Sequence, residues 1–296
     1  MAIKIALAGN PNCGKTTMFN ALTGANQYVG NWPGVTVEKK EGKCKENKDV
    51  IVTDLPGIYS LSPYTLEEVV SRDYLLKEKP EAIINLVDAT NIERNLYLTT
   101  QLLELGIPVV IALNMADLLE KNKISIDTKA LEKELGCKVV KTSALKGTGI
   151  HEVVKEAVTA AKKESIVSGK IKFSKDTEAA VSEMEGQLPS SVLKEQKKWY
   201  AIKLLERDAK VLEQLKLTAS VQNQVEKIAA RLEEKLDDDT ESIITNERYE
   251  AITHVVEKCV KKPKEKLSTS DKIDQIVTNR IPVSYTHLTL PTTSRV

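Results

Sequence analysis

A glycine-rich octapeptide, Gly9-Asn-Pro-Asn-Cys-Gly-Lys-Thr16, lies between an apolar run and a segment with helical spacing. The apolar run at residues 3–8 predicts a buried strand, and residues 15–22 predict a helix that begins inside the octapeptide. Backbone N–H groups of such a turn converge with the positive end of the helix, and together they bind phosphate. We expect Lys15 to reach the outer phosphates of a nucleotide and the Thr16 hydroxyl to bind Mg²⁺. The octapeptide is therefore predicted to be a P-loop.

Apolar strand-like runs alternate with amphipathic helical segments over residues 1–165, which is typical of an α/β domain with a mostly parallel sheet. Residues 40–49 are too few for a helical crossover, so the strands on either side of them are expected to form an antiparallel hairpin. We expect six strands, at residues 3–8, 35–39, 50–54, 82–87, 108–113 and 138–141. Helices are expected at residues 15–22, 66–77, 92–105, 128–135 and 150–161.

From about Phe173 the strand-like runs give way to charged segments with helical spacing. The chain is therefore predicted to have an α/β domain at 1–165 and an all-helical domain at 166–264. Residues 265–283 are expected to be a linker, and residues 284–296 a disordered or non-native tail. The helices expected in the second domain are at residues 194–205, 211–217, 221–236 and 247–260.

Composition excludes several kinds of function. A formal net charge of +1 and an aromatic content of 4% argue against a nucleic-acid partner. Neither a signal peptide nor a run of about 18 apolar residues is present, so the fragment itself is expected to be soluble. No disulfide framework or zinc site is expected either, because the cysteines lack a C-x-x-C pair and the histidines lack metal-ligand spacing. The cysteines are Cys13, Cys44, Cys137 and Cys259, and the histidines are His151, His254 and His287.

Two further segments are expected to close around the phosphates and Mg²⁺. Asp54-Leu-Pro-Gly57 follows the third predicted strand, so Asp54 can hold Mg²⁺, usually through water, while the Gly57 N–H faces the terminal phosphate. Residues 27–36 are expected to form a loop whose end, Gly34-Val35-Thr36, approaches the nucleotide. A threonine there can bind Mg²⁺ and phosphate when the loop closes. The alternative is that Thr36 is only a β-branched residue that opens a strand.

Two strings at the ends of later strands predict which base is read. Asn114-Met-Ala-Asp117 follows the fifth strand, and the Asp117 carboxylate can accept from the N1–H and N2 amine that guanine presents and adenine lacks. Thr142-Ser143-Ala144 follows the sixth strand, where a backbone N–H can meet guanine O6. These strings indicate a Ras-like P-loop G domain with a mixed, mostly parallel six-stranded sheet, which binds GTP or GDP. The predicted nucleotide contacts are Gly9, Asn10, Pro11, Asn12, Cys13, Gly14, Lys15, Thr16, Thr17, Gly34, Val35, Thr36, Asp54, Gly57, Asn114, Met115, Asp117, Ser143 and Ala144.

Isoleucine occupies position 58, where many G domains place a water-orienting glutamine. Isoleucine cannot hydrogen-bond water, and the loop before Thr36 contains no arginine that could supply positive charge. Another group must therefore orient the attacking water, and Glu67 and Glu68 are candidates only by their nearness in sequence. The groups expected to stabilise the developing charge from this chain are Lys15 and the backbone of the P-loop, with Thr36 and Gly57.

Over residues 1–283 the chain resembles the cytosolic N-terminal part of the FeoB family of bacterial ferrous iron transporters. The most specific matching strings are Gly9-Asn-Pro-Asn-Cys-Gly-Lys-Thr-Thr17, Val29-Gly-Asn-Trp-Pro-Gly-Val-Thr-Val-Glu38 and Asp54-Leu-Pro-Gly-Ile-Tyr-Ser-Leu-Ser62. Residues 87–96, 114–117 and 270–280 match as well.

The resemblance implies a GTPase domain followed by a helical domain that acts like a nucleotide-dissociation inhibitor. It further implies a membrane-embedded transporter region as partner and a place on the cytoplasmic face of the bacterial inner membrane. A homo-oligomer is a separate expectation. After residue 283 the expected membrane span is absent, so this chain alone is not expected to transport iron.

Potassium is a further expectation from the resemblance. In potassium-activated relatives, the asparagine matching Asn12 helps to bind K⁺ against the phosphates, and backbone carbonyls matching Gly30 and Trp32 complete the site. The resemblance therefore adds Asn12 to Lys15, Thr36 and Gly57 as the residues expected to act in catalysis. A cation there does the electrostatic work of an arginine finger. The alternative is that Asn12 only shapes the turn and Trp32 only packs the loop.

Two other functions stay open. The first is a soluble GTPase in RNA or ribosome assembly, which the neutral charge and few aromatic residues disfavour. The second is a nucleotide-binding switch with negligible turnover, which Ile58 suggests because isoleucine cannot hydrogen-bond the attacking water. Met115 stands where many G domains have a lysine that contacts the base and the loop. Its presence predicts modest affinity and quick nucleotide exchange.

Overall fold

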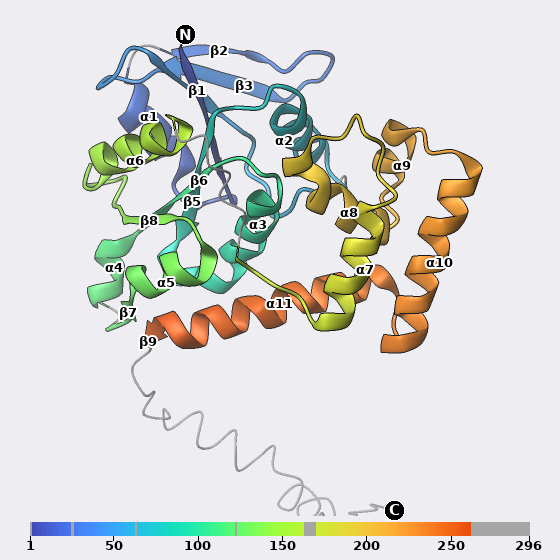
Figure 1. Ribbon diagram of the computed structural model, residues 1–296. Helices are drawn as coiled ribbons and strands as arrows, with labels where there is room; N and C mark the ends of the chain where they lie inside the picture. Colours follow the sequence, from blue (N-terminus) through green and yellow to red (C-terminus); the bar gives the residue numbers. More distant parts are fainter. Residues whose placement is uncertain (1, 25–26, 63, 122, 163–169, 262–296) are drawn as a thin grey trace, which may run out of the picture. The chain divides into compact units, whose positions relative to one another are not determined.

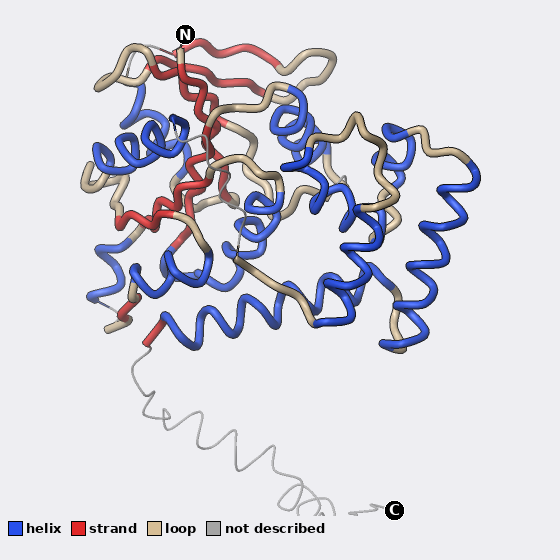
Figure 2. The backbone as a smooth tube through the Cα atoms, in the orientation of Figure 1, coloured by secondary structure: helices blue, strands red, loops and turns tan. Residues whose placement is uncertain are grey.

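The computed structural model describes residues 2–24, 27–62, 64–121, 123–162 and 170–261. The chain divides into two compact units, residues 1–260 and 261–296. The linker and tail expected at 265–283 and 284–296 lie outside the described residues. In the first unit, strands gather in one part of the molecule and helices alone build the other (Figure 2).

A seven-stranded sheet with the order β2-β3-β4-β1-β5-β6-β8 forms the centre of the N-terminal part (Figure 1). Strands β4, β1, β5, β6 and β8 pair in parallel, whereas β2–β3 and β3–β4 are antiparallel. The carboxyl ends of the parallel strands therefore meet at one edge, where ligands bind in sheets of this kind. The strands are β1 (Ile3–Gly9), β2 (Gln27–Asn31), β3 (Glu38–Lys43), β4 (Val50–Asp54), β5 (Ala82–Asp88), β6 (Val109–Asn114) and β8 (Lys138–Lys141).

The predicted mixed and mostly parallel sheet is confirmed, but the expected six strands are seven. The segment 27–36, predicted to be a loop, begins with strand β2, and the strand predicted at 35–39 starts only at Glu38. None of the residues of β2 is buried, so the strand lacks the alternation of buried and exposed positions from which strands are predicted. The expected hairpin is present, with β3 antiparallel to β4.

Both faces of the sheet are covered by helices. Along β1, Ile5 and Leu7 pack into a cluster with α1 and α6, while Ala6 and Ala8 belong to the opposite cluster with α2, α3 and α5. This alternation is what a strand buried on both sides produces. The helices are α1 (Lys15–Thr23), α2 (Leu66–Lys77), η1 (Ala89–Asn91), α3 (Ile92–Glu104), α4 (Ala116–Lys121), α5 (Thr128–Leu135) and α6 (Ile150–Lys162).

The C-terminal part is helical, as predicted. Helix α7 adds to the clearest helical segments of the sequence, and α4 in the sheet-bearing part was not expected. Helix α11 starts at Thr240 rather than near 247, because the Asp239 side chain caps it by accepting from Ser242 N. The remaining elements are α7 (Lys175–Glu185), η2 (Lys194–Gln196), α8 (Lys197–Leu205), α9 (Ala209–Leu215), α10 (Ala219–Leu236) and α11 (Thr240–Cys259), with a separate two-stranded sheet of β7 (Ser125–Ile126) and β9 (Val260–Lys261).

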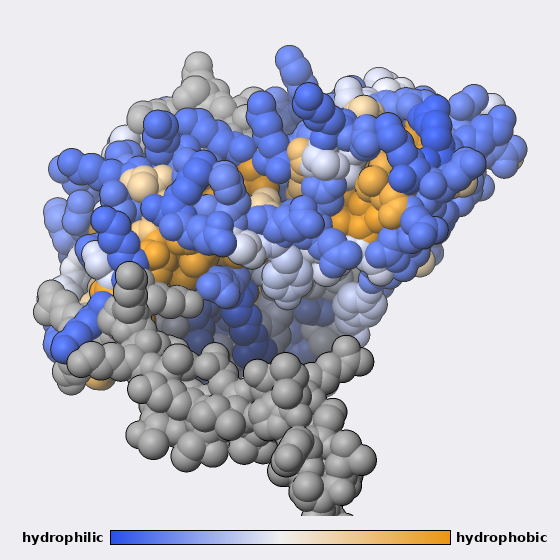
Figure 3. Space-filling view, turned by 90° about the horizontal axis from the view of Figure 1, so that it is seen from below, coloured by the Kyte–Doolittle hydropathy of each residue, from blue (hydrophilic) through white to orange (hydrophobic). Residues whose placement is uncertain are grey.

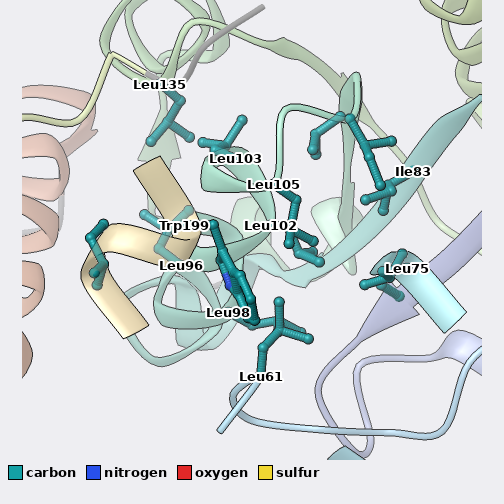
Figure 4. Close-up of a cluster of buried hydrophobic side chains, with 14 of the residues drawn as sticks. Leu61, Leu75, Ile83, Leu96, Leu98, Leu102, Leu103, Leu105, Leu135 and Trp199 are labelled. Atoms are coloured by element: carbon teal, nitrogen blue, oxygen red, sulfur yellow. The ribbon is translucent and has the colours of Figure 1, made fainter. Parts of the chain in front are cut away.

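One hydrophobic cluster continues from the sheet into the helical part. Trp199 of α8 is fully buried and points into a cluster with Leu61 and Leu98 (Figure 4). Hydrophilic residues dominate the visible part of the face in Figure 3, with separate apolar patches between them. Within the described ranges, no helix combines the length and apolar character that a membrane crossing requires.

Two buried ion pairs reinforce the contact between the sheet-bearing part and the helical part. Arg72 of α2 donates to both carboxylate oxygens of Asp208, at 2.7 and 3.3 Å. Arg248 of α11 pairs with Glu104 at the end of α3, and its side chain is fully buried. A buried charge that loses its partner is strongly unfavourable. These pairs therefore fix which surfaces of α2 and α3 meet the helices.

Replacing Arg72 by methionine should lower the free energy of unfolding by about 3–5 kcal/mol, because Asp208 would keep a buried, unpaired charge. The double variant Arg72→Met/Asp208→Asn should recover most of the loss, since asparagine removes the charge but keeps an oxygen for the bond from Val211 N. Urea denaturation of the three proteins measures both effects. Equal stability of Arg72→Met and the parent would contradict this role of the pair.

Candidate functional site at the carboxyl edge of the sheet

The octapeptide forms a tight turn between β1 and α1. Cys13 N donates to Asn10 O at 3.3 Å, and Met18 N donates to Gly14 O at 3.0 Å as the helix begins. Gly14 has φ 91°, and a Cβ added to it would lie 2.4 Å from Asn114 Nδ2. Only glycine therefore fits there. Asn12 is exposed and also has a positive φ of 66°, a conformation that asparagine tolerates better than most residues.

Lys15 and Asp54 face each other below this turn. Their Nζ and Oδ1 atoms are 2.5 Å apart, and the side chains are only 11% and 8% exposed. Burial raises the pKa of Asp54, whereas the charge and the hydrogen bond of Lys15 act to lower it. The structure thus brings together the predicted phosphate-binding lysine and the predicted Mg²⁺-binding carboxylate. The hydroxyl-bearing residues Thr16 and Thr17 are exposed at the start of α1.

The segment after β4 lies against the P-loop. Ile58 N donates to Gly9 O at 3.3 Å, and a Cβ on Gly57 would lie 3.3 Å from Pro11 Cα. Gly57 is therefore close to the predicted phosphate site. Ile58 is only 2% exposed and packs in the hydrophobic core. Its side chain does not replace a water-orienting glutamine.

Asn114 joins three of the predicted strings. Its Nδ2 donates to Cys13 O at 2.8 Å, and its Oδ1 accepts from Ala144 N at 2.9 Å. Thr142 Oγ1 donates to the same Oδ1 at 3.4 Å. Asn114 is buried, so removing its amide would leave these groups unpaired in the interior.

The predicted base-reading carboxylate lies next to a lysine that sequence reasoning did not single out. Lys146 Nζ is 3.0 Å from Asp117 Oδ2. Hydrogen bonds from Lys146 and Ser143 lower the pKa of Asp117. The carboxylate is thus ionised well below neutral pH and can accept two hydrogen bonds. Met115 precedes it with φ 61°.

The segment that contains Gly30, Trp32 and Thr36 is held by the sheet. Gly30 pairs with Lys39 in the β2–β3 register, and Trp32 N donates to Val37 O at 2.9 Å. The Trp32 indole N–H donates to Glu38 O at 3.1 Å, and its ring meets Tyr74 edge-on at 5.3 Å. Gly34 and Thr36 are exposed. Among the described residues, no hydrogen bond connects positions 30–36 with the P-loop; Gly30 and Trp32 are instead paired with Lys39, Val37 and Glu38.

Trp32 and Glu68, which the sequence offered as possible site residues, are engaged in packing and in helix capping. Trp32 is only 7% exposed, so it packs rather than stands free. Glu68 is buried, and its carboxylate accepts from Thr65 N in the capping box that starts α2. Glu67 is exposed on the first turn of the same helix. Burial raises the pKa of Cys13 to about 11, which keeps its thiol protonated.

The donor chemistry at this edge suits hard cations bound with a nucleotide rather than a resident metal cluster. In the part of the chain that the structure describes, no three His, Cys, Asp or Glu side chains gather as metal ligands. Asp54 and Thr16 offer oxygen atoms of the kind that Mg²⁺ prefers, and the exposed amide of Asn12 offers a neutral oxygen suited to K⁺.

A mixed sheet with this strand order, a P-loop after β1, and Asn114 bonded both to that loop and to Ala144 define a Ras-like P-loop G domain. The family model of ferrous iron transport protein B matches residues 3–157, and that of the FeoB cytosolic helical domain matches residues 173–261. The chain belongs to the FeoB family.

Curated relatives are similar over nearly all of the chain. The Fe(2+) transporter FeoB of Escherichia coli (strain K12) is 38% identical over 286 residues, which cover 94% of this chain and 36% of that protein. The Fe(2+) transporter FeoB of Methanocaldococcus jannaschii is 42% identical over 282 residues, covering 93% of this chain and 42% of that protein. The chain thus spans only about two fifths or less of the length of these relatives.

Solved structures of the N-terminal region, NFeoB, from S. thermophilus share the fold. The complex with GDP.AlF4⁻ and K⁺ is 49% identical with a TM-score of 0.79, and the match covers 86% of this chain and 99% of that one. A mutant bound to mGDP is 48% identical with a TM-score of 0.85, covering 88% and 100% of the two chains.

Proposed function

We propose that this chain binds guanine nucleotide and hydrolyses GTP to GDP and phosphate, as the cytosolic part of a ferrous iron transporter. The observation that carries the proposal is the position of Asn114, which joins the P-loop to the segment of Ser143 and Ala144 through bonds of 2.8 and 2.9 Å. Phosphate-binding and base-reading elements are thereby held in one rigid frame. The guanine nucleotides in the similar NFeoB structures support the same conclusion.

Within this proposal the residues divide by the part of GTP that they contact. The P-loop amides from Gly9 to Thr17 and the Lys15 ammonium hold the phosphates, and the Gly57 N–H faces the terminal phosphate. Asp117 accepts from the guanine N1–H and N2 amine, while the backbone at Ser143 and Ala144 meets O6. Lys15 exchanges its bond with Asp54 for bonds to phosphate when GTP enters. Asp54 is then free to take a new cationic partner.

Thr16, Thr36 and Asp54 are the residues that would hold Mg²⁺, and Asn12 with the carbonyls of Gly30 and Trp32 would hold K⁺. Asp54 fits the first role because it is a buried carboxylate that requires a positive neighbour. Such cations supply positive charge to the phosphate oxygens as charge builds on them. The carbonyls of Gly30 and Trp32 lie in and after β2, so their role requires this segment to leave β3. The relative solved with GDP.AlF4⁻ and K⁺ supports the potassium assignment.

The wider organisation follows from the family. We propose a G domain at 1–165 and a helical domain at 166–264, with the membrane-embedded part of the full-length transporter as partner on the cytoplasmic face of the inner membrane. A homo-oligomer is also proposed. A role in RNA or ribosome assembly is not favoured. A switch with negligible turnover is not favoured either, although the buried Ile58 cannot orient water.

Phosphate release in MgCl₂ and KCl tests the proposed activity. GTP should be hydrolysed in repeated turnovers, and ATP should be hydrolysed far more slowly. Nucleotide binding without turnover would favour the switch, and failure to bind GTP would reject the proposal.

Replacing Asn114 by alanine should weaken GTP binding about tenfold, because it unpairs the Cys13 carbonyl and the Ala144 N–H. Titration with a fluorescent GTP analogue measures the affinity. Asn223→Ala, an exposed position on α10, is the matched control and should bind like the parent. Equal affinities of the Asn114 and Asn223 variants would contradict the role of Asn114 as the frame of the site.

A further inference from the structure

Arg94, in the first turn of α3, stacks on the ring of Tyr59, two residues after Gly57. The guanidinium carbon lies 4.2 Å from the ring centroid, close enough for a cation–π contact. Tyr59 is 40% exposed and Arg94 is exposed, so the stack lies at the surface beside the P-loop. Neither residue is among those predicted to bind the nucleotide.

The backbone of Arg94 is tied to the P-loop from the other side. Asn10 Nδ2 donates to Arg94 O at 3.4 Å. Asn10 is only 3% exposed, and this bond is partly buried. The backbone at the start of α3 is therefore bonded to the P-loop, while the Arg94 side chain extends over Tyr59.

A closed ring of contacts results. It runs from Asn10 to Arg94, from Arg94 to Tyr59, and back through Ile58 N to Gly9 O at 3.3 Å. Gly57 directly precedes Ile58, and a Cβ added to it would lie 3.3 Å from Pro11 Cα, so it borders this ring on the P-loop side. Because Gly57 has no side chain, its position depends on its neighbours in the chain.

The segment around Gly57 is held at its two ends, Leu55 and Leu61, by hydrogen bonds that do not involve Arg94. Leu55 N donates to Leu7 O at 3.0 Å, and Leu61 N donates to Gln101 Oε1 at 2.5 Å. Between them, the Arg94 guanidinium covers the half-exposed Tyr59 ring. The stack thus restrains the stretch that directly follows Gly57.

We propose that Arg94 and Tyr59 form a clamp that positions the Gly57 N–H at the terminal phosphate during GTP hydrolysis. The inference rests on the proposed GTPase function. Arg94 is a positioning residue: its charge faces an aromatic ring, and it acts through Tyr59 and Gly57. Small displacements of a group that faces the reacting phosphate reduce turnover more than they reduce substrate binding.

Steady-state hydrolysis of GTP by the chain in MgCl₂ and KCl tests the clamp. Arg94→Ala and Tyr59→Leu should each lower kcat about fivefold, with KM changed less than about twofold. The double variant should be no slower than the slower single variant, because the two side chains act as one unit. Tyr59→Phe should keep the parent rate, since the ring remains, and Arg94→Lys should fall between the parent and Arg94→Ala. Arg231→Ala, an exposed arginine on α10, is the matched control.

The thermal unfolding midpoints of these variants should match the parent, which separates a positioning role from general destabilisation. Three results would overturn the clamp: parent-like kcat in Arg94→Ala, multiplied losses in the double variant, or lost turnover in Tyr59→Phe, which would assign the role to the hydroxyl. Absence of turnover in the parent would overturn the proposed GTPase function and the clamp together. Turnover in the parent with no response to Arg94→Ala overturns the clamp alone.

Discussion

Replacing Asp117 by alanine should weaken GTP binding at least about a hundredfold, because two hydrogen bonds from the base to an ionised carboxylate are lost. Lys146 and Ser143 hold this carboxylate ionised, so it accepts from guanine across the neutral pH range. ADP and ATP binding should change little, since adenine has no N1–H or N2 amine to offer. Titration of the variant and the parent with fluorescent guanine and adenine nucleotides measures the difference.

A second substitution at the same position sharpens this test. Asparagine presents one N–H donor and one carbonyl acceptor, which matches xanthine, whose C2 oxygen replaces the amine of guanine. Asp117→Asn should therefore prefer xanthosine triphosphate over GTP. Asp238→Ala, an exposed aspartate after α10, serves as the control and should bind GTP like the parent. Unchanged GTP affinity in Asp117→Ala would reject the assignment of Asp117 as the base reader.

Exchanging KCl for NaCl at constant ionic strength should lower GTP turnover by about a hundredfold, the size of effect found when an electrostatic partner of the transition state is removed. Residues 27–37 contain no arginine and position 58 is a buried isoleucine, so we expect a bound cation to supply the positive charge that these positions lack. Phosphate release measured at matched GTP saturation in the two salts checks this expectation. Equal rates would remove potassium from the proposed function.

Variants at position 12 separate K⁺ binding by the Asn12 amide from shaping of the turn by its backbone. Asn12→Gly keeps the backbone conformation at φ 66° but removes the amide oxygen, so it should lose the response to KCl. Asn12→Asp keeps an oxygen donor and should keep part of that response. Asn20→Gly, on an exposed position of α1, controls for the loss of an asparagine side chain. A normal potassium response in Asn12→Gly would show that Asn12 only shapes the turn.

Much of the fold could be predicted because local signals agree with it. Helices α2 and α5 have the predicted bounds, and both carry strong end signals in the sequence. Thr65 and Glu68 form a capping box, while Asp127 caps the start of α5 and Gly136 ends it in a left-handed conformation. Strand β2 gave no such signal, because an edge strand without a buried face leaves no period in the sequence.

The motifs of the candidate site and their order along the chain could be predicted from the sequence, but the hydrogen bonds that connect them could not. Each string follows a strand, and parallel strands bring their carboxyl ends to one edge. The bonds from Asn114 to Cys13 and from Asn10 to Arg94, by contrast, join residues far apart in sequence. No local pattern encodes such contacts. The same holds for Lys146, whose pairing with Asp117 depends on how two loops approach each other.

Because Trp32 is buried, moving its segment toward the nucleotide costs free energy. If Thr36 and the carbonyls of Gly30 and Trp32 are to reach the phosphates, β2 must first separate from β3, and the indole must leave Tyr74 and the Glu38 carbonyl. The apparent affinity for the triphosphate is then reduced by the fraction of molecules in which the segment is detached. A preference for the sheet of about 2.7 kcal/mol would leave about 1% detached. Phosphate and cation would have to bind together to overcome this preference for the sheet. The chain would then respond to the presence of both rather than to either alone.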